Sequence, residues 1–341
     1  MKIKGVEIPR VVFASGTYNF FGPGKGICHG WWYDKYLDWF LPWLSSSEKA
    51  GFIAKTTPFF YREGNMKLGG DFQPIEKFPD CVKFYFFRGL ALNSVGLSSP
   101  GAALLFELNE WQKIKSPFGL SHMSVLPTLK ERLTETAGFA RLLKKYLPDF
   151  SAPVWLEENL SCPNTGHDVC SFSDERLYHL AAIEKEDLGI PIFAKLSPED
   201  SVGEMLRIAR SGLCNGLSYA NTVKFGRLPG EIPWKKLFGT DDSEKSPLAK
   251  YGGGGLSGWI LGDLICRRIE GFRREEPYFP IMAGGGINCY WNWFATKKLI
   301  DRLVDKGRVN AIVIGTGKVI RPFYLRLTVW YADKKLKEAG R

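Results

Sequence analysis

Nine short apolar runs, each ending in polar residues or glycine, set the strongest constraint on how this chain can fold. They occupy residues 11–13, 52–54, 90–92, 122–125, 154–157, 192–194, 217–220, 280–282 and 311–314. Short apolar runs with such boundaries are typical of parallel strands that are buried on both faces. We therefore expect the residues that follow these runs to gather at one edge of a parallel sheet.

Helical patterns fill the intervals between the runs, at residues 129–146, 173–188, 201–211, 256–270 and 291–306. Strands that alternate with helices predict βα units. Eight such units close a TIM (β/α)8 barrel, whose active site lies at the carboxyl ends of its strands. Nine runs is one too many. The run at 90–92 follows an irregular segment, 59–88, so we place it in an excursion over the barrel mouth.

Length and composition fit a single barrel domain over residues 1–341, with 45% hydrophobic residues. Three segments depart from the barrel pattern: an aromatic-rich insertion at about 18–44, and excursions at about 59–88 and 223–250. Aromatic side chains of this kind either pack as a cap or form a surface for a protein partner or a lipophilic ligand. Those in the insertion are Trp31, Trp32, Tyr33, Tyr36, Trp39, Phe40 and Trp43.

Composition also narrows the class of protein. No segment approaches the ~18 uncharged apolar residues of a membrane span, and the first ten residues lack the apolar centre of a secretory signal, so we expect a cytoplasmic protein. The seven cysteines form no CxxC pair, which favours reduced thiols over disulfides or a metal site. The net charge of +10 indicates either attraction of anions, nucleic acid included, or a solvated basic surface.

The octet ENLSCPNT, residues 158–165, places one thiol among hydrogen-bonding side chains at the end of an expected strand. A catalytic base would sit at this position in a barrel enzyme. A lone cysteine is more often a small buried hydrophobic residue. The place of Cys162 between Ser161 and Pro163, in a polar loop, favours a thiol that acts as a base.

Glycine clusters at 252–258, 284–286 and 315–317 follow the late runs. They mark either ordinary turns or a phosphate site, because bare backbone N–H groups at late barrel strands bind phosphate. Lys195, after the run at 192–194, is either a surface lysine or a cation beside the pyrimidine edge of a flavin. Lys55 is similar, with the hydroxyls of Thr56 and Thr57 beside it. Together these features suit flavin mononucleotide (FMN).

Four asparagines fall at expected strand ends or in loops of the same face: Asn93, Asn159, Asn164 and Asn221. Any one alone is more often a turn or cap residue. An asparagine offers paired donors and an acceptor, which suit an imide-like ring with N–H and C=O groups. Four that converge therefore favour a site for such a ring.

At these residues the chain resembles the dihydroorotate dehydrogenases, and the resemblance extends through most of its length. The pieces that carry it, in the family's order, are Ala14-Ser15-Gly16, Lys55-Thr56-Thr57, Arg62-Glu63-Gly64-Asn65, Asn93-Ser94-Val95-Gly96-Leu97, Asn159-Leu160-Ser161-Cys162-Pro163-Asn164, Ala194-Lys195-Leu196, Ala220-Asn221-Thr222, Gly254-Gly255-Leu256-Ser257-Gly258, Gly284-Gly285-Gly286-Ile287 and Ile314-Gly315-Thr316-Gly317.

The resemblance implies FMN-dependent oxidation of (S)-dihydroorotate to orotate in pyrimidine (UMP) synthesis. Cys162 would remove the C5 proton while the C6 hydride passes to flavin N5. The substrate site would comprise Lys55, Asn93, Ser94, Val95, Gly96, Leu97, Asn159, Asn164, Asn221 and Thr222. The cofactor site would comprise Ala14, Ser15, Lys55, Thr56, Asn159, Lys195, Ala220, Ser257, Gly258, Gly285, Gly286, Gly315 and Thr316.

A cysteine base and a barrel that starts near the first residue resemble the cytosolic class 1 enzymes rather than the membrane-associated, quinone-using class. Within class 1 the oxidant is fumarate, or NAD reached through an iron–sulfur flavoprotein subunit, and the sequence leaves both open. We expect a homodimer without a nucleic-acid partner or transmembrane segment. The long insertion and excursions depart from the family pattern near the mouth.

Three other functions compete. A dihydropyrimidine dehydrogenase-like flavoprotein has no substrate carboxylate to bind, so Lys55 with 93–97 argues against it. A tRNA dihydrouridine synthase would exploit the positive charge, but only about 24 residues follow Gly317, too few for an RNA-binding helical domain. A non-catalytic flavin-binding subunit would have no use for Cys162 and the asparagine set.

Overall fold

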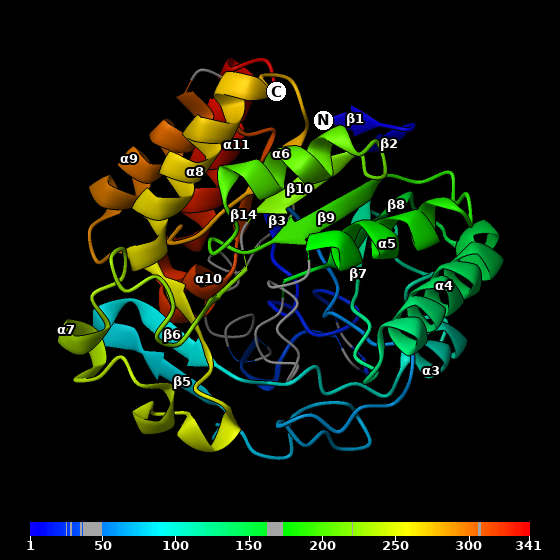
Figure 1. Cartoon of the computed structure of the whole chain (residues 1–341), viewed down its shortest axis with the longest axis horizontal. Helices are drawn as coiled ribbons and strands as arrows, with labels where there is room; N and C mark the ends of the chain where they lie inside the picture. The colour runs from blue at the N-terminus through cyan, green and yellow to red at the C-terminus, as the bar shows by residue number, and fades with distance from the viewer. Residues whose placement is uncertain are drawn as a thin grey trace.

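The computed structural model describes residues 1–24, 26–27, 29–34, 36, 50–161, 173–219, 221–305 and 308–341. Within these residues, eight parallel strands form one sheet in the order β4-β3-β14-β13-β10-β9-β8-β7 (Figure 1). In chain order they are β3 (Val11–Phe13), β4 (Ala50–Phe52), β7 (Phe118–His122), β8 (Val154–Asn159), β9 (Ile192–Leu196), β10 (Gly216–Tyr219), β13 (Ile281–Ala283) and β14 (Ala311–Ile314).

The two edges of this sheet meet and close it into a barrel. Just beyond β4, Ile53 forms a parallel bridge with Gly119 of β7, and Thr57 forms another with His122. The backbone N–H of Ala54 donates to the Gly119 carbonyl over 2.8 Å. The architecture is therefore a TIM barrel, as the sequence predicts.

Alternation along the strands sorts their side chains between two cores. One core holds the residues that point outward against the helices, such as Val11, Leu156 and Ile312. The second holds residues inside the barrel, such as Val12, Trp155 and Phe193, and includes Val6 and Ile8 near the amino-terminal hairpin. That hairpin consists of β1 (Lys2–Ile3) and β2 (Val6–Glu7). Both faces of the strands are buried, which explains their nearly unbroken apolar character.

Helices surround the barrel (Figure 1). The longer ones pack in neighbouring pairs, α4 on α5, α6 on α8, and α9 on both α8 and α11. Their bounds are α3 (Ala102–Glu107), α4 (Leu129–Tyr146), α5 (Ser173–Glu184), α6 (Val202–Arg210), α7 (Trp234–Phe238), α8 (Gly262–Glu275), α9 (Trp293–Val304), α10 (Thr316–Ile320) and α11 (Leu325–Glu338). A capping box between Thr128 and Glu131 starts α4 where the sequence predicts.

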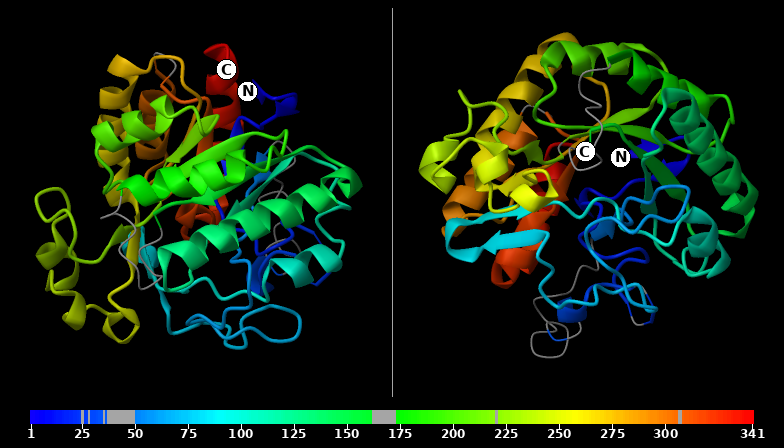
Figure 2. Two further views of the ribbon diagram at one scale, coloured as in Figure 1. Left: turned by 45° about the vertical axis from the view of Figure 1, so that its right-hand side comes forward. Right: turned by 60° about the horizontal axis from the view of Figure 1, so that its bottom comes forward.

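A second, antiparallel sheet, which we call the mouth sheet, lies at the end of the barrel away from the chain termini (Figures 1 and 2). Its order is β11-β12-β6-β5. The strands are β5 (Val82–Tyr85), β6 (Leu90–Asn93), β11 (Val223–Lys224) and β12 (Gly255–Gly258). The run at 90–92 is thus confirmed as part of an excursion, and the excursions after β4 and after β10 are joined through the pairing of β6 with β12.

Two sequence expectations are wrong. The helix expected at 256–270 begins only at Gly262, because Leu256 and its neighbours pair with β6 as strand β12. The strand expected at 122–125 lies earlier, at Phe118–His122, because Ser121 and His122 are buried by polar partners on β8. In the described residues, no helix is long and apolar enough to cross a membrane.

Candidate active site

A cavity of about 650 Å³ lies at the carboxyl ends of the barrel strands, under the mouth sheet. Most of the residues expected to bind substrate or cofactor line it: Ala14, Ser15, Lys55, Thr56, Asn93, Val95, Gly96, Leu97, Asn159, Lys195, Asn221, Thr222, Ser257, Gly258, Gly285, Gly286, Gly315 and Thr316. Cys162, Asn164 and Ala220 lie outside the described residues. Ser94 does not line the cavity, because its hydroxyl donates to the Tyr251 carbonyl over 2.8 Å.

One part of the cavity suits an anion. The buried Lys55 ammonium donates to the Ser98 carbonyl and lies 4.7 Å from the ring centre of Phe20. Beside it, Gly96 and Leu97 adopt left-handed backbone conformations, with φ of 69° and 61°. A leucine rarely adopts this conformation, and such strain is concentrated at ligand sites. Successive backbone N–H groups in a turn, together with a lysine, favour a carboxylate.

The segment 62–66 holds this turn in place. Arg62 Nε donates to the Gly96 carbonyl over 2.8 Å, and Asn65 Nδ2 donates to the Ser94 carbonyl over 2.7 Å. Gly64 has φ of 61°, and a Cβ there would meet Ser98 Oγ at 2.4 Å. The sequence shows this motif, Arg62 to Asn65, and the structure supplies its role as a support for the 93–98 turn.

Two amide side chains lie together at the ends of β8 and β10. Asn221 Nδ2 donates to Asn159 Oδ1 over 3.1 Å and to Ser161 Oγ over 3.3 Å. Asn221 Oδ1 in turn accepts from the Thr222 N–H over 2.9 Å. These bonds orient both amides, with the Asn159 carbonyl directed toward Asn221. Asn159 is therefore left to offer donors to the cavity, where its Nδ2 is 3.5 Å from Thr56 Oγ1.

Lys195, the second lysine described at the cavity, is held from below by a carboxylate inside the barrel. Lys195 Nζ lies 3.1 Å from Glu157 Oε1. Glu157 also accepts hydrogen bonds from Ser121 Oγ at 3.0 Å and from Ser218 Oγ at 2.5 Å. We refer to Glu157, Lys195, Ser121 and Ser218 as the barrel polar cluster.

Glycines form the opposite part of the cavity, at the ends of β13 and β14. Gly284 tolerates no side chain, since a Cβ would meet the Val313 carbonyl oxygen at 1.8 Å. Thr316, at the start of α10, exchanges a 2.7 Å hydrogen bond with Ser257 Oγ of the mouth sheet. Bare backbone beside two hydroxyls suits a phosphate.

Aromatic side chains from the insertion and the 59–88 excursion form the outer wall of the cavity. Trp32 meets Phe78 edge to face, with ring centres 5.4 Å apart, and its Nε1 donates to the Lys77 carbonyl over 2.8 Å. This wall includes Trp31, Trp32, Tyr33, Tyr36, Phe78, Phe84 and Phe86. Trp32 of the insertion thus packs against the 59–88 excursion, and the same aromatic residues line the cavity, while 37–44 lie outside the described residues.

An ion pair ties this wall to the glycine end. The buried Lys318 ammonium of α10 contacts the Asp34 carboxylate and lies 3.6 Å from the ring centre of Tyr18. Asp34 also accepts from the Trp31 N–H over 2.8 Å. Lys318 and Asp34 thus connect the start of α10 to Trp31 of the aromatic wall.

The cysteines of the described residues keep their protons near neutral pH, because burial raises the pKa of each thiol. Cys289 lines the cavity, and burial raises the pKa of its thiol to about 12. Burial likewise raises the pKa of the Cys81 and Cys266 thiols to about 11. In the part of the chain that the structure describes, no group of three or more His, Cys, Asp or Glu side chains could hold a metal ion.

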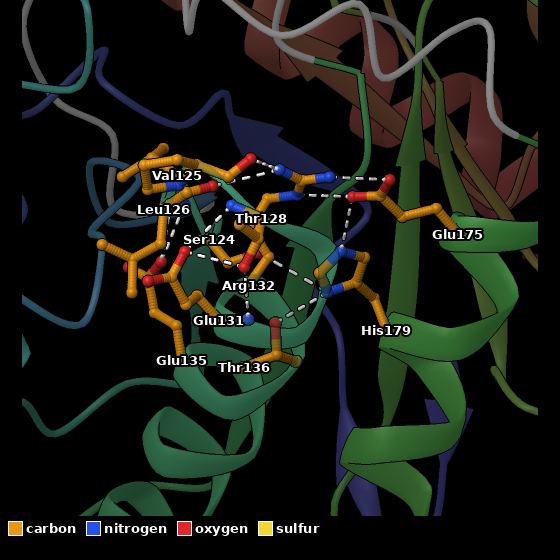
Figure 3. Close-up of polar contacts among 11 residues, drawn as sticks. Ser124, Val125, Leu126, Thr128, Glu131, Arg132, Glu135, Thr136, Glu175 and His179 are labelled. Atoms are coloured by element: carbon orange, nitrogen blue, oxygen red, sulfur yellow. Dashed lines mark hydrogen bonds and ion pairs between the residues drawn. The ribbon is translucent and has the colours of Figure 1, made fainter.

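A buried polar cluster joins α4 to the first turns of α5 (Figure 3). Arg132 of α4 forms a paired contact with Glu175, at 2.6 and 2.9 Å. His179 bonds to Glu175 at 3.3 Å and to Thr136 at 2.8 Å. Hydrogen bonds from His179 and Arg132 lower the pKa of Glu175 to about 2.

Sequence analysis missed some residues that the geometry makes prominent. Glu157 carried no signal of its own, although a carboxylate inside a buried apolar run is unusual. Gly284 belongs to the glycine cluster at 284–286, but the sequence does not reveal its close contact with the Val313 carbonyl. Asp34 and Lys318 pair across 284 residues of sequence, a relationship that no local pattern reveals.

Comparison with known proteins adds distant relatives. No protein-family model matches the chain. The catalytic subunit of dihydroorotate dehydrogenase B (NAD(+)) from Sulfolobus acidocaldarius is 27% identical over 67% of this chain and 65% of its own length, just under two thirds. The subunit of the same name from Caldicellulosiruptor saccharolyticus is 27% identical over 94% of this chain and 88% of its own. Dihydroorotate dehydrogenase A (fumarate) from Lactobacillus delbrueckii subsp. bulgaricus is 27% identical over 66% of each chain. The chain is thus a distant homologue of the dihydroorotate dehydrogenases, a family of oxidoreductases with NAD-linked and fumarate-linked members.

Proposed function

We propose that this protein is a class 1 dihydroorotate dehydrogenase, a single FMN-binding barrel domain that oxidises (S)-dihydroorotate to orotate in pyrimidine synthesis in the cytoplasm. One observation carries the proposal. A single cavity is lined by a lysine with a strained backbone turn, a pair of oriented amides, a buried lysine and bare glycine backbone. These four features suit, in turn, a carboxylate, an imide-like ring, the edge of a flavin and a phosphate.

The residues present fit FMN. Gly285, Gly286, Gly315 and Thr316 would hold its phosphate, where unobstructed backbone and the Ser257 and Thr316 hydroxyls converge. Lys195 would face the ring edge that gains negative charge on reduction. Bound flavin supplies the acceptor, at N5, for the hydride that leaves C6 of the substrate.

The remaining chemistry belongs to the chain. Lys55 and the N–H groups of Val95, Gly96 and Leu97 would bind the substrate carboxylate, with Asn93, Asn159, Asn164, Asn221 and Thr222 around the ring. Cys162 would take the C5 proton as a thiolate, and the C5–H electron pair would form the C5=C6 double bond as the C6 hydride departs. The charge and electron count balance, because one proton and one hydride leave the substrate.

The electron acceptor that restores the flavin is fumarate, or NAD through an iron–sulfur flavoprotein subunit. Relatives of both kinds match the chain with the same 27% identity. We propose a homodimer as the assembly, as the family resemblance implies. The aromatic wall lies between the flavin site and the surface, so it would be the part of the chain nearest to an approaching acceptor.

The test is to mix the FMN-loaded protein with dihydroorotate without oxygen and follow the flavin absorbance. Bleaching by dihydroorotate, with no bleaching by dihydrouracil, is the expected result. Fumarate, NAD and a quinone added to separate bleached samples would then identify the oxidant by the return of colour. Bleaching by dihydrouracil instead would replace this proposal with a uracil-type reductase, and no bleaching by either would favour a non-catalytic flavin-binding subunit.

A further inference from the structure

The barrel polar cluster places the Glu157 carboxylate in the interior of the barrel, paired with Lys195. The side chains of Glu157 and Lys195 are 1% and 9% exposed. Removing two charges from water costs more than their mutual attraction returns unless the geometry is very good, so a buried ion pair is weak support for stability. A pair kept in the interior therefore calls for a role beyond packing.

The geometry around Glu157 fixes this carboxylate in one position. Ser121 and Ser218 donate to different oxygens, at 3.0 and 2.5 Å, and Lys195 shares the Ser121 side at 3.1 Å. Glu157 is on β8, and its three partners stand on β7, β9 and β10 of the same sheet. Three donors from rigid strands leave Glu157 no freedom to turn away.

The cluster also connects to the cavity wall through hydroxyls. Ser121 Oγ is 2.9 Å from Thr56 Oγ1, and Thr56 Oγ1 is 2.8 Å from Ser15 Oγ. Ser15, Thr56 and Lys195 all line the cavity, whereas Glu157 lies beneath them. The carboxylate thus acts on whatever occupies the cavity through Lys195 and these hydroxyls, without touching it.

We propose that Glu157 is a positioning residue that aims the Lys195 ammonium at the flavin site and offsets part of its positive charge, and so sets the reduction potential of the bound flavin. The inference rests on the proposed function, since it requires a flavin in this cavity. A fixed positive charge beside the ring stabilises the negative charge that the ring gains on reduction. A carboxylate 3.1 Å behind that ammonium weakens the effect.

The test is the midpoint potential of bound FMN, measured against a reference dye without any pyrimidine substrate. Glu157→Gln removes the offsetting charge. We expect it to raise the equilibrium constant for two-electron reduction of FMN roughly tenfold, which corresponds to a midpoint potential about 30 mV higher. Glu157→Asp keeps the charge and should stay nearer to the wild-type potential. In Glu157→Gln/Lys195→Met, which removes both members of the buried pair and is the change folding tolerates best, the rise should be absent.

The neighbouring carboxylate provides a matched control. Glu158 stands on the same strand but points to the opposite face, where it pairs with His122 at 2.8 Å under α4. Glu158→Gln makes the same chemical change one residue away and should leave the potential unchanged. A wild-type potential in Glu157→Gln, a rise that persists in the double variant, or an equal rise in Glu158→Gln would each overturn the inference. If the wild-type protein does not bind FMN, or if its bound FMN is not reduced by dihydroorotate, that result would instead count against the proposed function.

Discussion

The Asn221 side-chain amide donates two hydrogen bonds to its neighbours, to Asn159 Oδ1 over 3.1 Å and to Ser161 Oγ over 3.3 Å. Its carbonyl oxygen is also engaged, by the Thr222 N–H. The two asparagines therefore differ in their hydrogen bonding: Asn221 orients the Asn159 amide, and the Asn159 donors face the cavity.

This difference gives the first prediction. Asn159→Ala should weaken orotate binding roughly tenfold or more, since a ligand acceptor in a buried site loses its donor. Asn221→Ala should weaken it less, and Asn221→Ser, which retains one hydrogen-bonding group, less still. Titration of orotate against the flavin spectrum measures all three. Equal losses for Asn159→Ala and Asn221→Ala would mean that both amides contact the ligand.

The second prediction concerns recognition of the substrate carboxylate. Lys55→Ala should reduce orotate affinity by roughly 10- to 100-fold, the worth of a hydrogen bond to a charged group, while leaving uracil affinity nearly unchanged. Lys55 also supports the Ser98 carbonyl, so general damage to the turn would weaken both ligands. The ratio of the two dissociation constants separates these cases, and an unchanged ratio would exclude Lys55 as the carboxylate ligand.

The third prediction concerns Cys162, which lies outside the described residues. Cys162→Ala should lower turnover by at least roughly 100-fold, the usual contribution of a general base, with the spectrum of bound flavin unchanged. Cys289→Ala is the matched control, because the Cys289 thiol lines the cavity but its raised pKa of about 12 keeps it protonated. Full activity in Cys162→Ala would remove this residue from its proposed role.

The fourth prediction concerns the glycine at the end of β13. Gly284→Ala should destabilise the fold by about 3 kcal/mol or more, because the added methyl would meet the Val313 carbonyl oxygen at 1.8 Å and neither backbone can retreat within the sheet. Gly230→Ala has nothing within 4 Å of the added atom and should be neutral. Urea unfolding of the two variants makes the comparison.

The fifth prediction concerns acid. Glu175 has a folded-state pKa lowered from 4.5 to about 2, so its contribution is present above about pH 4.5 and is lost as the pH falls toward 2. Linkage sets that contribution at roughly 2 to 3 kcal/mol. Glu175→Gln should therefore be less stable than the wild type at pH 7, and the difference should shrink as the pH falls through that window. A difference that stays constant down to pH 3 would show that the ionised carboxylate contributes nothing to stability.

The sequence predicts those parts of the fold that depend on local pattern. The helix over Leu129–Tyr146 matches because its capping box and periodicity lie within the segment itself. Strand β7 begins earlier than expected because Gly119 and Ser121 interrupt the apolar pattern, and Ser121 is buried only through its hydrogen bond to Glu157 of the neighbouring strand. Likewise, Leu256 belongs to a strand only because β6, about 165 residues earlier in the chain, supplies its partner.

The same distinction applies to the site. Strand-end position and residue type suffice to gather lysines, asparagines and glycines, since a barrel brings all its strand ends together. The residues that support the site are not apparent from the sequence. Glu157 lies within an apolar run, and Asp34 pairs with Lys318 near the other end of the chain. Such partners depend on three-dimensional proximity, which a sequence without its fold does not contain.

The mouth sheet has a consequence for engineering this chain. Its central hydrogen bonds join β6, from the excursion after β4, to β12, from the excursion after β10. Neither excursion can be replaced alone by that of a relative without leaving a row of unpaired backbone groups above the cavity. A chimaera of this chain must therefore transplant both excursions as a matched set, in the register that places Asn93 opposite Gly255.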